Sequence, residues 1–462
     1  MKKHTLLFSI FYLLSSIFYP LTSTAQDSLN IHLLYHWQDT TLTDFTSHQS
    51  IYNEIFGFVQ DGKEYGVIGS TVGAHIFDVT DAQNIFPVIT IPAASQGASV
   101  VNRDYDFFNG HLYIVGDQSG ARFQIADVSF LPDSAPIVYD SNSLFSRAHT
   151  ITVDAPTARL YANGGDGEMS IYDISNPSQP SLLLNCTTLP VWSSIQYVHD
   201  CFAKNDTVYC HAAQRGLFVM DFTDIQNPAL LGSVTQYPQQ GYNHSGWLHN
   251  DGAMYAQADE NHGFDVKLFD VSNLSDITLI DTIGSGISEA YSIPHNVVWR
   301  DDFLYVSYYH DGLYIFNCSD PENIFISGFY DTCVLPDTNN YRGNWGVYPL
   351  LPSGKILASD MQNGFYVFDV SAATGIHESP SADDLTVVFP NPFRDGFNIS
   401  IPDATKNNYT YELLDINAKL LQQGTISRTI SSINTGKDIP SGNYFLRINA
   451  NRKSFTKKLV KQ

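Results

Sequence analysis

The sequence predicts an all-β protein: a seven-bladed β-propeller of four-stranded blades, closed by its N-terminal strand and followed by a small C-terminal β-sandwich. Three observations lead to this prediction. A strand motif recurs seven times at a nearly constant interval, no segment shows helical periodicity, and the charge changes sign before the last stretch of chain. We expect a signal peptide at residues 1–25, the propeller at 26–374, a linker at 375–382 and a separate domain at 383–462.

The recurring motif is a strand of alternating aromatic and β-branched residues that ends at an aspartate, as in GFYVFDVSA. Successive copies end 49, 46, 48, 49, 47 and 52 positions apart, which indicates a repeat architecture. We interpret the end residue as a turn former whose side chain bonds nearby backbone amides. The seven end residues are Asp78, Asp127, Asp173, Asp221, Asp270, Asn317 and Asp369.

Each repeat contains more than this one strand. Segments such as HLYIVGD and FLYVSYY precede the motif by a short turn, another apolar run lies before them, and a further one, such as NPALLGSV, follows the aspartate. Four antiparallel strands in about 48 residues describe a propeller blade. A stacked solenoid is the alternative, but a four-stranded antiparallel unit of this length favours radial packing.

The first and last repeats are complementary. The last copy, ending at Asp369, has no fourth strand after it, whereas IHLLYHWQDT, residues 31–40, is an extra strand ahead of the first complete repeat. We therefore expect the N-terminal strand to pair with the last hairpin, because ring closure removes an exposed sheet edge.

The ends of the chain and its charge indicate an exported protein. Residues 1–25 combine two lysines, an apolar core and a small-residue stop, which is typical of a secretory signal peptide, and no later stretch is long and apolar enough for a transmembrane segment. Residues 26–382 contain 40 acidic and 11 basic residues, whereas 383–462 contain 7 acidic and 11 basic. The acidic body argues against nucleic acid or an anionic membrane surface as a partner.

Five cysteines in an exported chain suggest disulfides. A hairpin turn in HDCFAKNDTVYC places Cys201 opposite Cys210, close enough for a bond if the pair is not hydrogen-bonded. Cys318 and Cys333 are a second candidate pair, and Cys186 is left over, so the pairing stays provisional.

The repeat region and the C-terminal segment each resemble known families, the repeat region first. The repeat of Gly, aromatic, Val or Ile, Phe or Tyr, Asp and Val resembles the LVIVD repeat, and GNWGVYPLLPSGKILASDMQNGFYVFDV resembles the choice-of-anchor B family. That family comprises exported bacterial propeller-like proteins joined to varied surface-attachment modules. The resemblance covers about residues 30–371 and implies no catalytic activity.

The C-terminal segment carries the second resemblance. VVFPNPFRDGFNISI, YELLDINAKLLQQGTI and the lysine-rich end IPSGNYFLRINANRKSFTKKLVKQ resemble the C-terminal sorting domain of the type IX secretion system. The resemblance implies an interaction with that secretion machinery and a secreted or outer-surface location. Its short alternating strands are typical of a small β-sandwich.

Four histidines fall at one point of the repeat, at the start of the innermost strand: His149, His199, His244 and His295. Asn344 occupies the corresponding place in the last repeat, and Arg103 lies close to it in the second. Because innermost strands line the channel of a propeller, these side chains are expected to form a polar ring at one mouth.

Three interpretations of the ring compete. Each histidine bonds a neighbouring Asp or carbonyl and braces its own blade, or the ring binds a polar or anionic ligand, or two or more imidazoles share a transition metal. No cofactor is established by the sequence. Trp247, Trp299 and Trp345 follow these positions and either wall the same funnel or belong to the core.

Known catalytic motifs are absent from the sequence. The favoured function is therefore a cell-surface or secreted binding module with an unknown extracellular ligand or protein partner. The alternative is an extracellular hydrolase or lyase that uses the polar ring at the channel mouth. Only Glu54 and Asp104 break the repeat pattern as acidic channel residues, which gives the enzyme little support.

Overall fold

The structure is a computed structural model that describes residues 28–44, 48–166, 169–286, 291–333, 335–336, 340–375, 386–401, 409–436, 439–450 and 453–462. The predicted signal peptide lies outside these residues, as does all but the first residue of the predicted linker.

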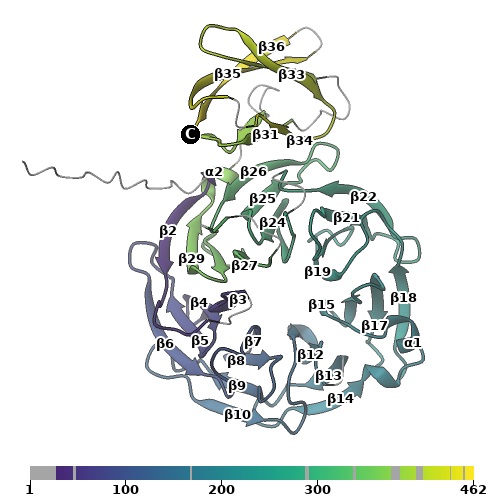
Figure 1. The fold of residues 1–462 in the computed structure, drawn as a ribbon. Helices are drawn as coiled ribbons and strands as arrows, with labels where there is room; N and C mark the ends of the chain where they lie inside the picture. Colours follow the sequence, from purple (N-terminus) through teal and green to yellow (C-terminus); the bar gives the residue numbers. More distant parts are fainter. Residues whose placement is uncertain are drawn as a thin grey trace, which may run out of the picture.

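Seven antiparallel sheets of the kind that form propeller blades lie around a central channel (Figure 1). We number them blades one to seven. Blades one to three contain β3 (Tyr52–Gln60), β4 (Lys63–Ser70), β5 (Gly73–Asp78) and β6 (Phe86–Pro92); β7 (Arg103–Phe108), β8 (His111–Gly116), β9 (Phe123–Asp127) and β10 (Ile137–Ser141); and β11 (Thr150–Asp154), β12 (Arg159–Asn163), β13 (Met169–Asp173) and β14 (Ser181–Asn185).

Blades four to six have the same order. They contain β15 (Asp200–Lys204), β16 (Thr207–His211), β17 (Leu217–Asp221) and β18 (Ala229–Val234); β19 (Asn243–Leu248), β20 (Met254–Asp259), β21 (Val266–Asp270) and β22 (Thr278–Ile283); and β23 (Val297–Arg300), β24 (Phe303–Tyr308), β25 (Gly312–Asn317) and β26 (Phe325–Tyr330). The described residues also include four short helices beside the blades: η1 (Ala155–Thr157), η2 (Cys186–Thr188), α1 (Trp192–Ile195) and α2 (Ser371–Thr374).

Blade seven joins the two ends of the repeat region. Its strands β27 (Asn344–Tyr348), β28 (Ile356–Asp360) and β29 (Gly364–Asp369) are completed by the N-terminal strand β2 (His32–Trp37). The β2–β29 pairing runs antiparallel from His32 opposite Asp369 to Trp37 opposite Phe365, so the pairing predicted from the sequence is observed. The structure also contains a strand that the sequence did not predict, β1 (Ser28–Leu29), which adds a fifth strand to blade six.

The residue that ends each third strand forms the predicted turn. In all seven blades its Oδ1 accepts a hydrogen bond from the backbone N–H two residues later, at 2.8–3.0 Å. Asn317 serves as well as the six aspartates, because the bond needs only an oxygen acceptor. The repeated acid is therefore a local backbone feature of the blade.

The core lies between neighbouring blades. Strands β4 and β5 are almost fully buried on both faces, as are their counterparts, whereas fourth strands such as β6 and β18 are largely exposed. The fourth strand of blade six, β26, is the exception and is buried. Aromatic rings cross from blade to blade: Phe77 stacks on Phe365 at 4.3 Å between ring centroids, and Tyr209 stacks on Tyr255 at 4.4 Å. This packing explains why the second and third strands read as continuous apolar runs.

The C-terminal segment forms two antiparallel sheets with a core of their own. One contains β30 (Val387–Phe389), β31 (Gly396–Ser400) and β34 (Ile430–Asn434). The other contains β33 (Leu420–Ile426), β32 (Tyr409–Leu414), β35 (Gly442–Ala450) and β36 (Lys453–Lys461).

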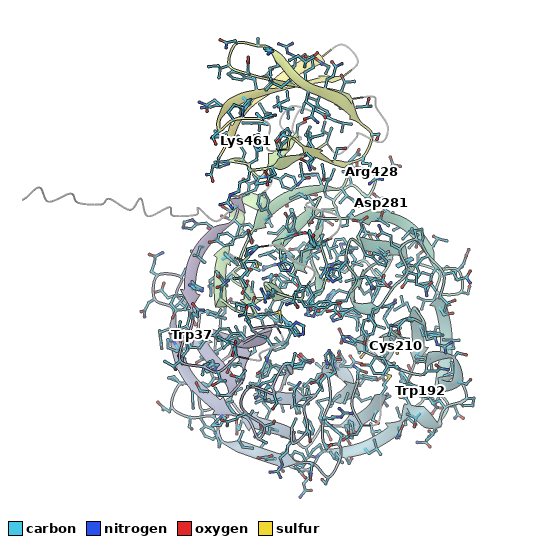
Figure 2. All side chains as sticks on the ribbon, in the orientation of Figure 1. Trp37, Trp192, Cys210, Asp281, Arg428 and Lys461 are labelled. Carbon is cyan, nitrogen blue, oxygen red and sulfur yellow. The ribbon has the colours of Figure 1, made fainter. Side chains whose placement is uncertain are left out.

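The C-terminal sheets contact the outer side of blades five and six. Phe389 packs against Phe329 with 5.2 Å between ring centroids, and Ser432 Oγ donates to the Gly286 carbonyl at 2.6 Å. Asp281 and Arg428 lie on opposite sides of this junction (Figure 2) and line a cavity of about 510 Å³.

Candidate functional site

Four histidines from four consecutive blades lie side by side at one end of the channel. His149 and His199 directly precede β11 and β15, His244 lies in β19, and His295 lies two residues before β23. Ring centroids are 4.3 Å apart for the first pair, 4.2 Å for the second and 4.3 Å for the third. The structure therefore brings all four side chains singled out in the sequence into one row.

The Nδ1 atoms of this row connect neighbouring blades. Nδ1 of His199 lies 3.2 Å from the carbonyl of His244, and Nδ1 of His295 lies 2.5 Å from the carbonyl of Trp345. Because a carbonyl only accepts, Nδ1 carries the proton in both rings and Nε2 keeps its lone pair. Nδ1 of His149 lies 2.7 Å from Asp117 Oδ2. The bracing interpretation placed these bonds within one blade, whereas they are made between blades.

Asn344 and Arg103 do not join the row. Asn344 pairs with Asp360 as Asn243 pairs with Asp259, and both strands shift register at the next residue. Trp345 therefore holds the place of His244 in its blade and packs against His295, with ring centroids 4.5 Å apart. Asn344 is buried and donates to the Ser359 carbonyl of its own blade. Arg103 turns away, because its guanidinium donates to the carbonyls of Ser70 and Ser95 at 2.7 and 2.6 Å.

The three tryptophans have different roles. Trp247 and Trp345 line the channel cavity, as the funnel interpretation expected. Trp299 is 1% exposed and belongs to the core between blades five and six.

Many polar residues of the channel satisfy the free edges of the innermost strands. Each innermost strand pairs on one side only, so its remaining N–H and C=O groups face the channel and need partners. Side chains of the preceding blade supply these partners at 2.6–3.0 Å. Two carboxyls accept from backbone N–H groups, Asp104 from Ile151 and Asp106 from Val153. Three hydroxyls donate to backbone carbonyls, Thr150 to His199, Thr152 to Cys201 and Ser245 to His295. These contacts hold consecutive blades in register.

Glu54 reaches from blade one toward blades six and seven. Its Oε2 accepts from Trp345 Nε1 at 3.1 Å and from Asn296 Nδ2 at 3.2 Å, and its Oε1 accepts from the N–H of Ile55. Burial raises the pKa of Glu54 to about 7, and repulsion from Asp200 adds to the rise.

Three further carboxyls share this environment. Burial raises the pKa of Asp104 well above its ordinary value, with a further contribution from Glu54, and raises the pKa of Asp106 to about 7 and that of Asp200 to about 6. Perturbed acids of this kind cluster at functional sites more often than elsewhere.

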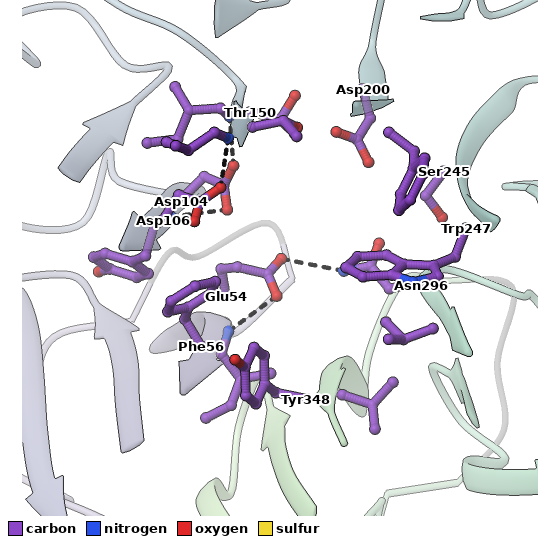
Figure 3. A pocket seen from close by; sticks show the side chains of 18 of the residues that line it. Glu54, Phe56, Asp104, Asp106, Thr150, Asp200, Ser245, Trp247, Asn296 and Tyr348 are labelled. Carbon is purple, nitrogen blue, oxygen red and sulfur yellow. Dashed lines mark hydrogen bonds between the residues drawn. The ribbon is translucent and has the colours of Figure 1, made fainter. Parts of the chain in front are cut away.

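The carboxyls and several aromatic rings line one cavity of about 550 Å³ inside the channel. Figure 3 shows Glu54, Asp104, Asp106 and Asp200 around this space, with the rings of Phe56, Trp247 and Tyr348. The volume falls in the range of small-molecule pockets. The arrangement can surround a small ligand with both negative charge and aromatic surface.

Besides Asp117, a second acidic residue, Glu260, lies at the histidine row itself. Glu260 follows β20, its Oε1 accepts a hydrogen bond from Tyr309 Oη at 2.6 Å, and its Oε2 lies 3.9 Å from His244 Nε2. Burial raises the pKa of Glu260 to about 7.

Sequence reasoning missed Asp200, Asp106 and Glu260. The first two could have been found from strand alternation, because Asp200 follows His199 directly and Asp106 lies two residues after Asp104. Glu260 lies just beyond the pairing of Asn243 with Asp259, next to His244, at a place that has no counterpart in the repeated motif.

The predicted disulfides are wrong: all five cysteines are described and buried, and none forms a disulfide. Cys201 and Cys210 do oppose each other in the β15–β16 register. Their thiols pack against blade three instead, where Cys201 Sγ accepts from Asn163 Nδ2 at 3.3 Å and Cys210 Sγ lies 4.0 Å from Met169 Sδ.

Cys318 and Cys333, the second predicted disulfide pair, have different surroundings. Cys318 Sγ lies 3.8 Å from the Phe316 carbonyl in the core between blades five and six, whereas Cys333 Sγ lies 3.8 Å from His310 Nδ1. Burial raises the pKa of the Cys318 thiol, as expected for a cysteine that packs as an apolar residue.

Comparison with known families identifies two segments. Residues 387–462 match the secretion system C-terminal sorting domain, and residues 160–188, which span β12 to β14, match the LVIVD repeat. The protein is secreted or carried to the outer surface. Its C-terminal segment is similar to type IX secretion tails and implies an interaction with that machinery.

A comparison with curated proteins finds no match. Within the described part of the chain, no helix has the length and apolar character needed to cross a membrane.

Proposed function

We propose that the repeat region is an extracellular binding module that takes a small organic cation in its channel. The observation that carries the proposal is the cavity in which carboxyls from three blades, Glu54, Asp104 and Asp200, face aromatic side chains. We also infer that the β2–β29 pairing closes a seven-bladed ring and that the chain is a choice-of-anchor B protein with the domain limits expected from the sequence.

The electrostatics of the cavity favour a cation. The pKa values of its carboxyls are raised because burial removes water from them, and repulsion between carboxyls adds to the rise at Glu54 and Asp104. A positive ligand relieves both costs, whereas an anion increases them. Aromatic faces add cation–π attraction, which grows when water is excluded.

Ligand titration tests the proposal. Choline and arginine serve as cationic probes, glucose as a neutral one and succinate as an anionic one, with calorimetry and tryptophan fluorescence as readouts. We expect one-to-one binding of a cationic probe at about pH 7.5 and a loss of about tenfold or more at about pH 5, where the carboxyls take up protons.

Asp200→Asn is the informative variant, because an amide oxygen can still accept from the Cys201 N–H while the charge is lost. It should weaken the cation by about tenfold or more. Asp221→Asn is the matched control: Asp221 lies in a surface turn that Asn317 forms equally well in blade six. Failure of both cations to bind, or equal binding by Asp200→Asn and wild type, overturns the proposal.

One observation favours the second function, a hydrolase or lyase. The pKa of Glu54 is raised to about 7, the range in which a carboxyl works as a general acid. Release of new sugar ends from extracellular polysaccharides by wild type, lost in Glu54→Gln, would support this alternative.

A further inference from the structure

We propose that His244, Glu260 and His295 bind a divalent first-row transition ion of the zinc class at the histidine end of the channel. Each residue offers one ligand atom, and the three atoms lie within 4.8 Å of one another. Two imidazoles and one carboxylate are a donor set that zinc accepts with a further coordination position open.

The supporting contacts fit metal ligands. Tyr309 Oη donates to Oε1 of Glu260, which leaves Oε2 toward His244. The Trp345 carbonyl accepts from Nδ1 of His295, which leaves the lone pair on Nε2. Metal-binding histidines usually donate their second ring N–H in this way, and ligating carboxylates are themselves hydrogen-bonded.

His244 provides an independent observation. The residue is 4% exposed, its buried Nδ1 has no hydrogen-bond partner among the described residues, and its Nε2 faces Glu260 Oε2 at 3.9 Å, beyond hydrogen-bond distance. A buried imidazole with so few polar contacts costs free energy, and an ion bound at Nε2 would give that nitrogen the partner it lacks. His199 and His295 both bond the next blade through Nδ1, so His244 differs from its neighbours in the row.

The spacing requires only a modest adjustment. Ligands bound at roughly 2.0–2.2 Å to a zinc ion lie roughly 3–4 Å from each other. The 3.9 Å separation of His244 Nε2 and Glu260 Oε2 already falls in that range.

The test uses the full exported protein, stripped with a chelator and titrated with Zn²⁺ by calorimetry and with Co²⁺ by absorption spectroscopy. We expect one ion per chain, with a cobalt spectrum of nitrogen and oxygen ligation and a higher melting temperature. Glu260→Gln keeps an acceptor for Tyr309, and His295→Asn keeps a donor for the Trp345 carbonyl. Either change should reduce affinity about 100-fold or more, and Tyr309→Phe about 10–100-fold.

His249→Asn is the control, because His249 is a buried histidine of blade five that bonds the Asp301 carbonyl away from the site. Its affinity for Zn²⁺ should equal that of wild type. The proposal is wrong if the stripped protein takes up no ion, or if Glu260→Gln and His295→Asn bind as tightly as wild type. Cation binding at Asp200 does not depend on either result, so the two proposals can fail separately.

Discussion

Trp345 of blade seven donates its indole N–H to Glu54 of blade one at 3.1 Å, between residues 291 positions apart in the chain. The bond joins the last repeat to the first inside the channel. It also places a carboxyl where burial raises its pKa to about 7.

This shift predicts a pH effect on stability. The folded state keeps the Glu54 proton up to about pH 7, whereas the unfolded chain releases it near the ordinary pKa of 4.5. The contribution of Glu54 to the free energy of unfolding is therefore greatest below pH 4.5 and is lost as the pH rises through 7. Glu54→Gln removes the titration. Its free energy of unfolding relative to wild type should therefore rise by about 1–3 kcal/mol between about pH 5 and pH 8.

Urea unfolding at several pH values measures this difference. Glu64→Gln is a control of opposite sign, since Lys355 Nζ lies 2.9 Å from Glu64 and the pKa of that carboxyl is lowered. Its difference from wild type should stay constant over the same pH range, because its contribution is lost only in acid. A flat profile for Glu54→Gln would contradict the assignment.

A second prediction concerns the buried ion pair of blade five. Lys267 Nζ lies 3.0 Å from Asp259 Oδ2, and neither side chain is exposed. Lys267→Met leaves a buried carboxylate without its counter-charge and should lower the free energy of unfolding by about 3–5 kcal/mol. Arg122→Met breaks the partly exposed Arg122–Asp140 pair and should cost less than about 1 kcal/mol. Equal costs for the two variants would contradict the prediction.

The repeat was visible in the sequence because its cause is local. An Asp or Asn side chain accepts a hydrogen bond from the backbone amide two residues later, so the third strand of each repeat ends at one of these two residue types. The histidine row was found in the same way, since four residues at equal positions converge when strands are placed side by side. Register within a blade was predictable, as the opposition of Cys201 and Cys210 shows.

The parts that sequence reasoning missed depend on irregularities and distant contacts. Trp345 rather than Asn344 lies beside His295, because the strand register places Asn344 level with Asn243 and Trp345 level with His244, one residue away from the alignment of the sequence repeats. Glu260 is positioned by a hydrogen bond from Tyr309, which lies 49 positions away in the next blade. Opposition of two cysteines fixes their backbones but not the direction of their thiols, which is why the disulfide prediction failed.

A third prediction concerns β2. Deletion of residues 28–40 leaves the edge of β29 unpaired and removes Trp37, whose ring lies 5.1 Å from that of Phe77. We expect a lower melting temperature and self-association by size-exclusion chromatography with light scattering, because an open edge pairs with other chains. Deletion of residues 28–30 removes only β1, so blade six keeps four strands and the protein should stay monodisperse. Unchanged behaviour of the longer deletion would contradict the role of β2.

The last prediction separates export from folding. Deletion of residues 383–462 removes the sorting segment, whose core is its own and whose contacts with the blades include Phe389 against Phe329 and Ser432 with Gly286. The truncated protein should fold and give a β-type circular dichroism spectrum. Its melting temperature should fall by only a few degrees, because exposure of the Phe329 surface lowers the free energy of unfolding by on the order of 1 kcal/mol.

In its native host the truncated protein should stay in the periplasm, while the full chain reaches the outer surface or the medium. Cell fractionation and protease accessibility on intact cells measure the two locations. A host with an inactive type IX system is the control, since it should retain the full chain in the same compartment as the truncated one. Surface exposure of the truncated protein would show that the information for export lies outside residues 383–462 and would contradict the sorting role of this segment.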